Sequence, residues 1–319
     1  MSCRLSIILA AQNEEAYIAE ALGSVLAQAH TGTEIVFVDD GSKDDTWGIV
    51  DGLAGDLPEG VKLRRVRHDA NRGLARARNR AIAMAQGEHV MFMDADDAFE
   101  PGTLASLLAQ LDRGDDVRLV FPRYRWVGGD GSSLSKMSPV PSGAITAEQL
   151  LFDNPIHSDS GVTMRRQDFL SIGGFDEEMT GYIGGDAWLR FALHYGSGAI
   201  ASTPEAIVRY RRHDRQTTAN WQRMDQNWGI LAGKLERDHP EFYATFGPRA
   251  KARHRLFCAH LAYGGGEDRI ARRFLWQALR GDPAMLVSRK DARLLAASCL
   301  AAFLPASLLA YLRSHPGPR

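Results

Sequence analysis

HVMFMDADD, residues 89–97, joins a largely apolar run to three carboxylates within four positions. The apolar part shows no alternation of apolar and polar residues, which predicts a β-strand covered on both faces. Two comparable runs, at residues 5–10 and 34–38, and a further strand expected at 61–66 precede it, and helical patterns separate them. Strands that alternate with helices indicate an α/β protein with a mostly parallel, doubly wound sheet.

The spacing of apolar residues predicts helices at 15–29, from Trp47 onward, at 72–86 and at 103–111. Asn71 is the expected N-cap of the third of these helices. Its expected buried stripe consists of Leu74, Ala77, Ala81, Ile82 and Ala85.

The chain changes character after a further strand expected at 117–121. Residues 128–143 are rich in Gly, Ser and Pro, which predicts a hairpin or a long loop near the site. From about residue 220 the pattern is helical to the end, with breaks at 264–266 and 281–283.

Polar side chains follow three of the predicted strands directly, namely Asn13 and Glu14, Asp39 and Asp40, and the group Asp94, Asp96 and Asp97. In open α/β sheets ligands bind at the carboxyl ends of the strands. Any one of these groups is also typical of a helix cap or a turn. Their occurrence at three strand ends favours a binding site.

Of the three groups, Asp94, Asp96 and Asp97 give the most specific indication of a binding site. Carboxylates this close raise one another's pKa unless a cation neutralises them, and Mg²⁺ or Mn²⁺ is the natural ion for oxygen ligands. One alternative is a solvated, Asp-rich turn. Another is a phosphoaspartyl hydrolase, but that class carries Thr or Val where Ala98 stands and places the motif near the chain start.

Arginines at intervals of four lie on one face of the predicted helix 72–86, namely Arg72, Arg76 and Arg80, with Arg78 beside them. They either bind a diphosphate or solvate the helix surface. Neither GxGxxG nor GxxxxGK[ST] occurs, so metal and side chains would have to hold the phosphates.

Composition is that of a globular protein, with 319 residues, 24% charged and 45% apolar. Three cysteines without CxxC spacing and no signal-peptide pattern predict a cytoplasmic protein. The net charge of −1 gives no reason to expect nucleic acid as a partner, but it hides a split. Residues 1–200 hold 18 basic against 29 acidic residues, a net of −11, and residues 201–319 hold 20 against 10, a net of +10.

Residues 294–312 form an uncharged run about long enough to cross a bilayer, although it is rich in Ala and broken by Pro305. A membrane span, an interfacial helix and a packed helix pair are all compatible with it. Together with the basic residues before it, the run predicts peripheral contact with the inner face of a membrane.

Six segments in order resemble the family 2 glycosyltransferases of the GT-A fold over residues 4–218. They are SIILAAQNEEAYIAEALGSVLAQ, EIVFVDDGSKDDT, NRGLARARNRAIAMAQGEHVMFMDADDAFEPGTL, GGFDEEM, GGDAWLRFAL and RYRRHDRQTT. The resemblance implies a GT-A domain at 1–219, with a nucleotide-sugar half at 1–112 and an acceptor half at 113–219. A helical region, 220–319, follows.

The resemblance also implies the donor site. Glu14 and Asp40 would contact the base and ribose, the backbone of Ala10 and Ala11 would line that pocket, and Arg76 or Arg78 would lie near the diphosphate. The Pro-x-Tyr-Asn that many relatives carry is here Ala10-Ala11-Gln12-Asn13.

For the metal, Asp96 is the implied ligand of Mn²⁺ or Mg²⁺, assisted by Asp94 or Asp97. His213 in Arg211-Arg212-His213 would add a ligand or be structural, and Arg211 or Arg212 would stabilise the leaving diphosphate.

Asp186 in Gly184-Gly185-Asp186 matches the family's general base, where many relatives have Glu in place of Gly185. The alternative role of Asp186 is as the N-cap of the following helix. A single base and no enzyme nucleophile predict inversion at the anomeric carbon. His157, Asp159 and Trp221 are the expected acceptor contacts.

The function predicted is an inverting glycosyltransferase that uses a nucleotide-diphosphate sugar, with a UDP-sugar favoured, and a glycan or lipid-linked acceptor. A sugar-phosphate nucleotidyltransferase and a non-catalytic sugar-nucleotide-binding protein are the alternatives. The first of these lacks its Gly-rich loop, because Gln12-Asn13-Glu14-Glu15 follows strand one.

Overall fold

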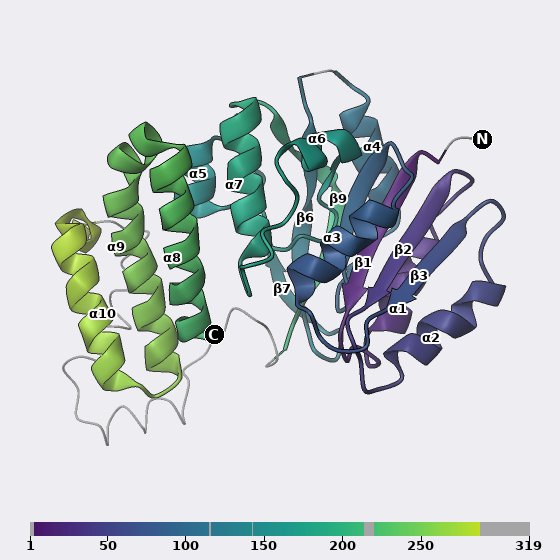
Figure 1. Ribbon diagram of the computed structural model, residues 1–319, viewed down its shortest axis with the longest axis horizontal. Coiled ribbons are helices and arrows are strands. Elements are labelled where there is room, and N and C mark those ends of the chain that lie inside the picture. The colour runs from purple at the N-terminus through teal and green to yellow at the C-terminus, as the bar shows by residue number, and fades with distance from the viewer. Residues whose placement is uncertain (1–2, 115, 142, 214–219, 288–319) are drawn as a thin grey trace. The chain divides into compact units, whose positions relative to one another are not determined.

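The computed structural model describes residues 3–114, 116–141, 143–213 and 220–287 (Figure 1). The chain divides into two compact units, residues 1–214 and 215–319. The first unit is an α/β domain around one sheet, which confirms the predicted fold class.

In the described part of the first unit, nine strands form a sheet in the order β3-β2-β1-β4-β8-β6-β9-β5, and β7 pairs with β6. Their bounds are β1 Leu5–Ala11, β2 Thr33–Asp39, β3 Lys62–Arg67, β4 His89–Asp94, β5 Ala98–Phe99, β6 Leu119–Gly128, β7 Ser133–Met137, β8 Thr163–Arg165 and β9 Ile200–Arg212. Every residue of β1 and β2 is buried, as expected for strands covered on both faces.

The sheet is mixed rather than parallel throughout. Strands β3, β2, β1 and β4 are parallel, as are β6 and β9. The short strand β8 runs antiparallel to both β4 and β6, and β5 is antiparallel to β9. The segment 128–143 contains the predicted hairpin, in which β7 returns against β6.

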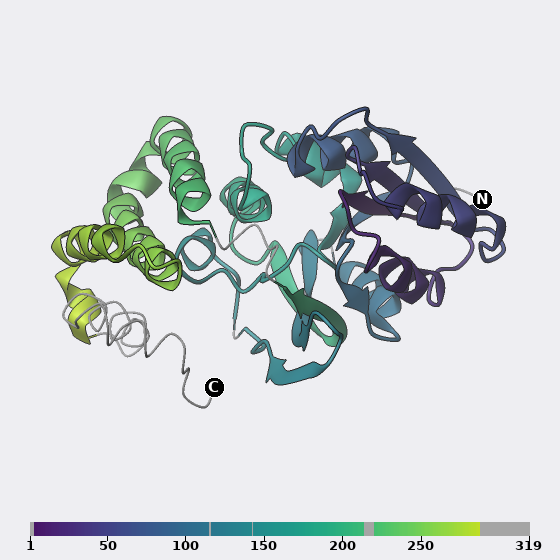
Figure 2. The same cartoon turned by 90° about the horizontal axis from the view of Figure 1, so that it is seen from below.

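Helices cover both faces of this sheet. Helix α1 contacts α2, whereas α3 packs against β1 and β2 from the opposite side (Figure 2). The helices of the unit are α1 Ile18–Leu26, α2 Thr46–Gly52, α3 Leu74–Met84, α4 Thr103–Leu111, α5 Ala147–Asp153, α6 Arg166–Ser171 and α7 Ile183–Tyr195.

The predicted cap of α3 is wrong. The N-cap is Gly73, at φ 97°, and no side chain caps the helix. The amide oxygen of Asn71 accepts a hydrogen bond from the Gly73 N–H, so it closes the turn before the helix instead. The predicted stripe is buried except for Leu74, which is exposed, and Arg78 is buried beside it.

The second unit consists of α8 Trp221–Asp238, α9 Pro240–Gly264 and α10 Asp268–Gly281, followed by a short 3₁₀ turn at Pro283–Val287. Helix α9 packs against both α8 and α10. The core of this unit includes Met224, Leu256, Cys258, Ala259, Phe274 and Ala278. The predicted breaks between helices lie where α9 and α10 end.

Within the described residues, no helix is both long enough and apolar enough to span a membrane. The uncharged run at 294–312 lies outside them.

Candidate active site

The predicted polar groups at the ends of β1, β2 and β4 lie along one edge of the sheet. In register, Ala11 of β1 faces Asp39 of β2, and Ala10 faces Asp94 of β4. The N–H of Asp40 donates to the Ala11 carbonyl at 2.8 Å. The three strand ends therefore meet around Ala10 and Ala11.

The carboxylate of Asp40 holds the loop that leads into α3. It accepts hydrogen bonds from the backbone N–H groups of Arg72 at 2.9 Å and Gly73 at 2.8 Å, and it pairs with His68 Nδ1 at 2.8 Å. Asp40 is buried, so this contact fixes the wall of the predicted nucleotide pocket. The half-buried Glu14 lies at the same edge, and its N–H donates to Thr46 Oγ1 at 2.8 Å.

The turn after β4 crowds three carboxylates together. One oxygen each of Asp94, Asp96 and Asp97 lies within 4.8 Å of the others. Burial, and next to it the charge of Asp94, raises the pKa of Asp96. Burial and the charges of Asp96 and Asp94 raise the pKa of Asp97 well above its usual range. Because a divalent cation would relieve this repulsion with oxygen ligands, the residues fit Mg²⁺ or Mn²⁺.

The three aspartates have different surroundings. Asp97 Oδ2 accepts from the hydroxyls of Ser158 at 2.8 Å and Ser160 at 2.6 Å, and Oδ1 accepts from the Arg211 N–H at 3.0 Å. Asp96 Oδ2 instead lies 2.9 Å from Nε2 of His213. Asp97 therefore anchors the turn to β9 and to the loop before β8, whereas Asp96 and His213 face each other.

Tyr17 stacks on His213, a contact that the sequence did not predict. Its ring stacks on the imidazole with centroids 5.5 Å apart, and the Arg211 guanidinium lies 4.8 Å from the same ring. Arg211 also donates to the Asp96 carbonyl and pairs with Glu20. These contacts join β9 to the start of α1, a pairing that no local pattern could reveal.

Arg78 is buried next to the acidic turn. Its guanidinium pairs with Asp94 and, at 2.6 Å, with Asp159, and 1% of its side chain is exposed. Burial alone would lower the pKa of Arg78, but the two carboxylates raise it. Arg76, in contrast, pairs with Glu177 at the surface, and Arg72 and Arg80 are exposed.

Asp159, expected at the acceptor, connects this ion pair to α7. Its Oδ1 accepts from the indole N–H of Trp188 at 3.0 Å. A Cβ on Gly184 would lie 1.7 Å from the same oxygen, so this approach requires glycine. Asp94, Arg78, Asp159 and Trp188 thus form one continuous chain of polar contacts.

Asp186 lies in the first turn of α7 and is fully buried. The helix begins at Ile183 with Tyr182 as its N-cap, so the alternative role of Asp186 as the N-cap is wrong. Oδ2 accepts from Arg190 Nε at 2.9 Å and Nη2 at 2.7 Å, which fixes the carboxylate. Neither Trp188 nor Arg190 was singled out in the sequence.

Gly185, the position at which many relatives carry Glu, is covered by an aromatic ring. Tyr182 adopts a left-handed backbone, φ 57°, and a Cβ on Gly185 would lie 2.1 Å from its ring. The ring occupies the space that a side chain at 185 would need.

The other two residues expected at the acceptor make contacts with aromatic rings. His157 packs among aromatic rings, 5.8 Å from Tyr124 and 5.1 Å from Trp126 by ring centroids. Burial, and then the charge of Lys136, lowers its pKa. Trp221 belongs to the second unit, where its ring packs on Phe274 and its N–H donates to Glu267 at 2.7 Å.

The unit is an α/β domain with a mixed sheet, an acidic turn at the carboxyl end of the central strand β4 and an aspartate in helix α7. This arrangement is that of a GT-A-like fold. The sequence profile described as Glycosyl transferase family 2 matches residues 6–173, more than half of the chain. The chain therefore belongs to this glycosyltransferase family.

Curated relatives agree with this assignment. An uncharacterized glycosyltransferase of Haemophilus influenzae is 25% identical over 75% of this chain and 74% of its own length. The Rhizobium meliloti succinoglycan biosynthesis protein ExoU is 43% identical over 33% of this chain. The chain spans 29% of ExoU and 34% of an uncharacterized Nostoc glycosyltransferase, so these two similarities cover a minor part of each relative.

Solved structures share the fold. The mannosyltransferase PcManGT from Pyrobaculum calidifontis, in complex with GDP-Man and Mn²⁺, has a TM-score of 0.60 at 22% identity, over 98% of this chain and 84% of that one. S. aureus TarS 1–349 in complex with UDP-GlcNAc has a TM-score of 0.58 at 19% identity, over 97% and 85%.

Proposed function

We propose that this chain transfers a sugar from a nucleotide-diphosphate donor to an acceptor hydroxyl, with inversion at the anomeric carbon. The observation that carries the proposal is the acidic turn, with Asp96 facing His213, linked through Arg78 and Asp159 to the helix that holds Asp186. A UDP-sugar is the favoured donor, consistent with the fold shared with TarS bound to UDP-GlcNAc.

Asp96 and His213 would hold Mn²⁺ or Mg²⁺, with Asp94 beside them, whereas the three hydrogen bonds on Asp97 suit an anchor. An ion held there would supply positive charge to offset that of the leaving diphosphate. Asp40 positions the loop 68–73 at the nucleotide side of the site.

Asp186 acts as the general base in this proposal. It takes the proton of the acceptor hydroxyl as that oxygen attacks the anomeric carbon and the bond to the diphosphate breaks. Arg190 holds the carboxylate in one orientation. Because the carboxylate removes a proton and forms no bond to the sugar, a single displacement inverts the anomeric centre.

The acceptor we propose is a glycan or a lipid-linked precursor, in line with the similarity to ExoU, named for succinoglycan biosynthesis. The location is the cytoplasm, at the inner face of the membrane. Helix α10 supports the membrane contact with exposed Arg269, Arg272, Arg273 and Arg280 and with Trp276, 59% exposed. Binding to anionic but not neutral vesicles, reversed by salt, is the expected result. Equal binding to both vesicles, or to neither, would contradict the membrane contact.

Thermal-shift measurements with UDP-, GDP- and dTDP-sugars, with and without Mn²⁺, test the donor proposal. Stabilisation by one nucleotide class should require Mn²⁺ and be lost in Asp96→Asn, while Asp116→Asn, an exposed aspartate, serves as control. The donor that stabilises the protein should also be hydrolysed slowly in the presence of Mn²⁺. Binding without hydrolysis or transfer would favour a non-catalytic protein, and pyrophosphate release from a nucleotide and a sugar phosphate would favour a nucleotidyltransferase.

A further inference from the structure

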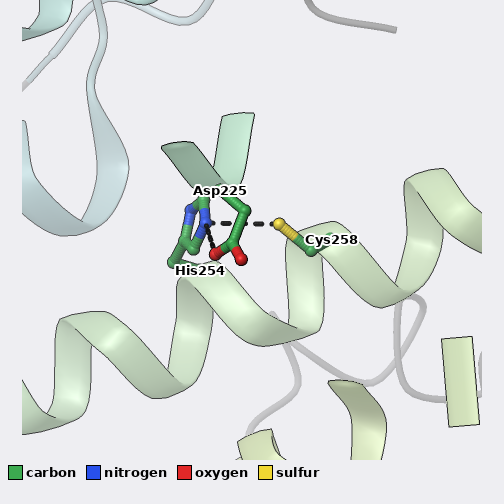
Figure 3. A group of neighbouring side chains, drawn as sticks. All are labelled: Asp225, His254 and Cys258. Carbon is green, nitrogen blue, oxygen red and sulfur yellow. Dashed lines mark hydrogen bonds and ion pairs between the residues drawn. The ribbon is translucent and has the colours of Figure 1, made fainter. Parts of the chain in front are cut away.

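A second cluster of metal-ligating side chains lies in the helical unit and shares no residue with the acidic turn. Asp225 comes from α8, and His254 and Cys258 come from α9 (Figure 3). One ligand atom of each lies within 4.8 Å of the other two. The spacing of four residues places His254 and Cys258 on one face of α9, toward α8.

The imidazole lies between the carboxylate and the sulfur. His254 Nε2 is 3.2 Å from Asp225 Oδ1 and 3.2 Å from Cys258 Sγ (Figure 3). Trp228 stacks on the imidazole with centroids 5.1 Å apart and planes 14° apart, which fixes its orientation. Arg255 pairs with the same carboxylate oxygen, so Asp225 already lies in a positive field.

These contacts do not form a nucleophilic triad. In such a triad the carboxylate holds Nδ1 and the nucleophile holds Nε2, on opposite sides of the ring. Here both neighbours approach Nε2, which can carry one proton or one lone pair but cannot serve as donor to one and acceptor from the other. Burial raises the pKa of Cys258 to about 12, whereas nucleophilic cysteines have lowered pKa values.

The distances suit a tetrahedral ion. Bonds of about 2.0–2.3 Å from Zn²⁺ to oxygen, nitrogen and sulfur at tetrahedral angles separate the ligand atoms by roughly 3.3–3.6 Å. The two separations of 3.2 Å in the structure need to open by only a few tenths of an ångström. Thiolate and imidazole ligands favour zinc over the hard ions that suit the acidic turn.

We propose that Asp225, His254 and Cys258 bind one Zn²⁺ ion that joins α8 to α9. The ion bonds to the sulfur as the thiol proton leaves to solvent, and to Nε2 through its lone pair. Water completes the fourth position on the side of Asp225, whose side chain is 28% exposed. The site shares no residue with the acidic turn.

Cobalt substitution tests this directly. The full chain, freed of any histidine tag and of metal, is titrated with Co²⁺. We expect one equivalent to give a thiolate-to-cobalt charge-transfer band with the visible bands of tetrahedral Co²⁺, and Zn²⁺ to displace it. Absence of the charge-transfer band in folded wild-type protein would overturn the proposal without recourse to a variant.

Variants assign the ligands. Cys258→Ser should lose the charge-transfer band and the rise in melting temperature on adding Zn²⁺, and His254→Ala and Asp225→Asn should weaken Zn²⁺ binding at least about tenfold. Cys3→Ser is the matched control, because Cys3 lies in the first unit, and it should retain both signals. Retention of the band in Cys258→Ser would contradict the site. Mn²⁺-dependent transfer, measured in parallel, reports the acidic turn separately.

Discussion

Arg78 and Asp159 lie 81 residues apart in the chain, and their side chains form a 2.6 Å ion pair. The other amino group of Arg78 pairs with Asp94 at the end of β4. A single buried cation thus connects the acidic turn to the loop that packs on α7. The ion pairs of Arg78, together with the sheet, therefore hold the acidic turn in position relative to α7.

Replacement of Arg78 should damage folding and activity together. Arg78→Met leaves two half-buried carboxylates without their cation. Loss of one partner of a fully buried pair costs about 3–5 kcal/mol of unfolding free energy, which is the upper limit here. Urea unfolding and kcat/KM measure the two effects. Arg80→Met, an exposed site on the same helix, should stay within about 0.5 kcal/mol of wild type. Similar stability for both variants would mean that the ion pairs contribute little.

Asp186→Asn should abolish transfer and leave donor binding intact. The amide oxygen still accepts a hydrogen bond from Arg190 but cannot take a proton, and loss of a general base lowers kcat by about 10²- to 10⁴-fold. Initial rates and donor titration separate the two properties. Glu178→Gln, at an exposed position before α7, is the control. Transfer at the wild-type rate by Asp186→Asn would assign the base to another group.

Gly184→Ala should disturb the site through Asp159. The new methyl group would lie 1.7 Å from Asp159 Oδ1, and relief of such overlap typically costs about 1–3 kcal/mol. We expect a lower urea midpoint and a lower kcat. Gly229→Ala in α8 meets no atom within 4 Å and should be neutral or stabilising by up to about 1 kcal/mol. Equal effects at both glycines would contradict the close approach.

Glu34 should make the protein sensitive to acid. Burial alone would raise the pKa of Glu34, but hydrogen bonds from Ser6, the Gln86 N–H and Arg64 lower it below its ordinary 4.5. The unfolded chain therefore binds this proton more tightly, and stability falls as pH drops through 4.5.

The Glu34→Gln variant isolates this contribution. Urea unfolding between about pH 3 and pH 6 should show a shallower loss of stability on acidification than in wild type. The exposed Glu59→Gln is the control and should follow wild type. Parallel curves for Glu34→Gln and wild type would exclude a role for the buried carboxylate.

Sequence patterns predicted the parts of the fold that depend on local spacing. The apolar runs at 5–10 and 34–38 became the buried strands β1 and β2, and the helix expected at 103–111 has those bounds. The acidic group after the run at 89–93 lies at the sheet edge, as parallel strands require. The six family segments predicted the family itself.

Local spacing could not reveal what depends on distant partners. Arg78 resembled its exposed neighbours on α3, and only the tertiary fold buries it between Asp94 and Asp159. Asn is a common N-cap residue, and this made Asn71 the expected cap of α3. The N-cap is instead Gly73, at positive φ, and the helix begins only at Leu74. The three residues of β8 carry too short a pattern to predict an antiparallel strand at the centre of the sheet.

Strand β9 has a consequence for the order in which the site is completed during synthesis. The N–H that it donates to Asp97 comes from a residue 114 positions later, and the imidazole that faces Asp96 comes from one 117 positions later. A ribosome that has made only the first 199 residues has already produced the acidic turn and Asp186. In the nascent chain the acidic turn therefore lacks its contacts with Arg211 and His213 until β9 has been synthesised. The insertion of β9 between β6 and β5 is then a late folding step.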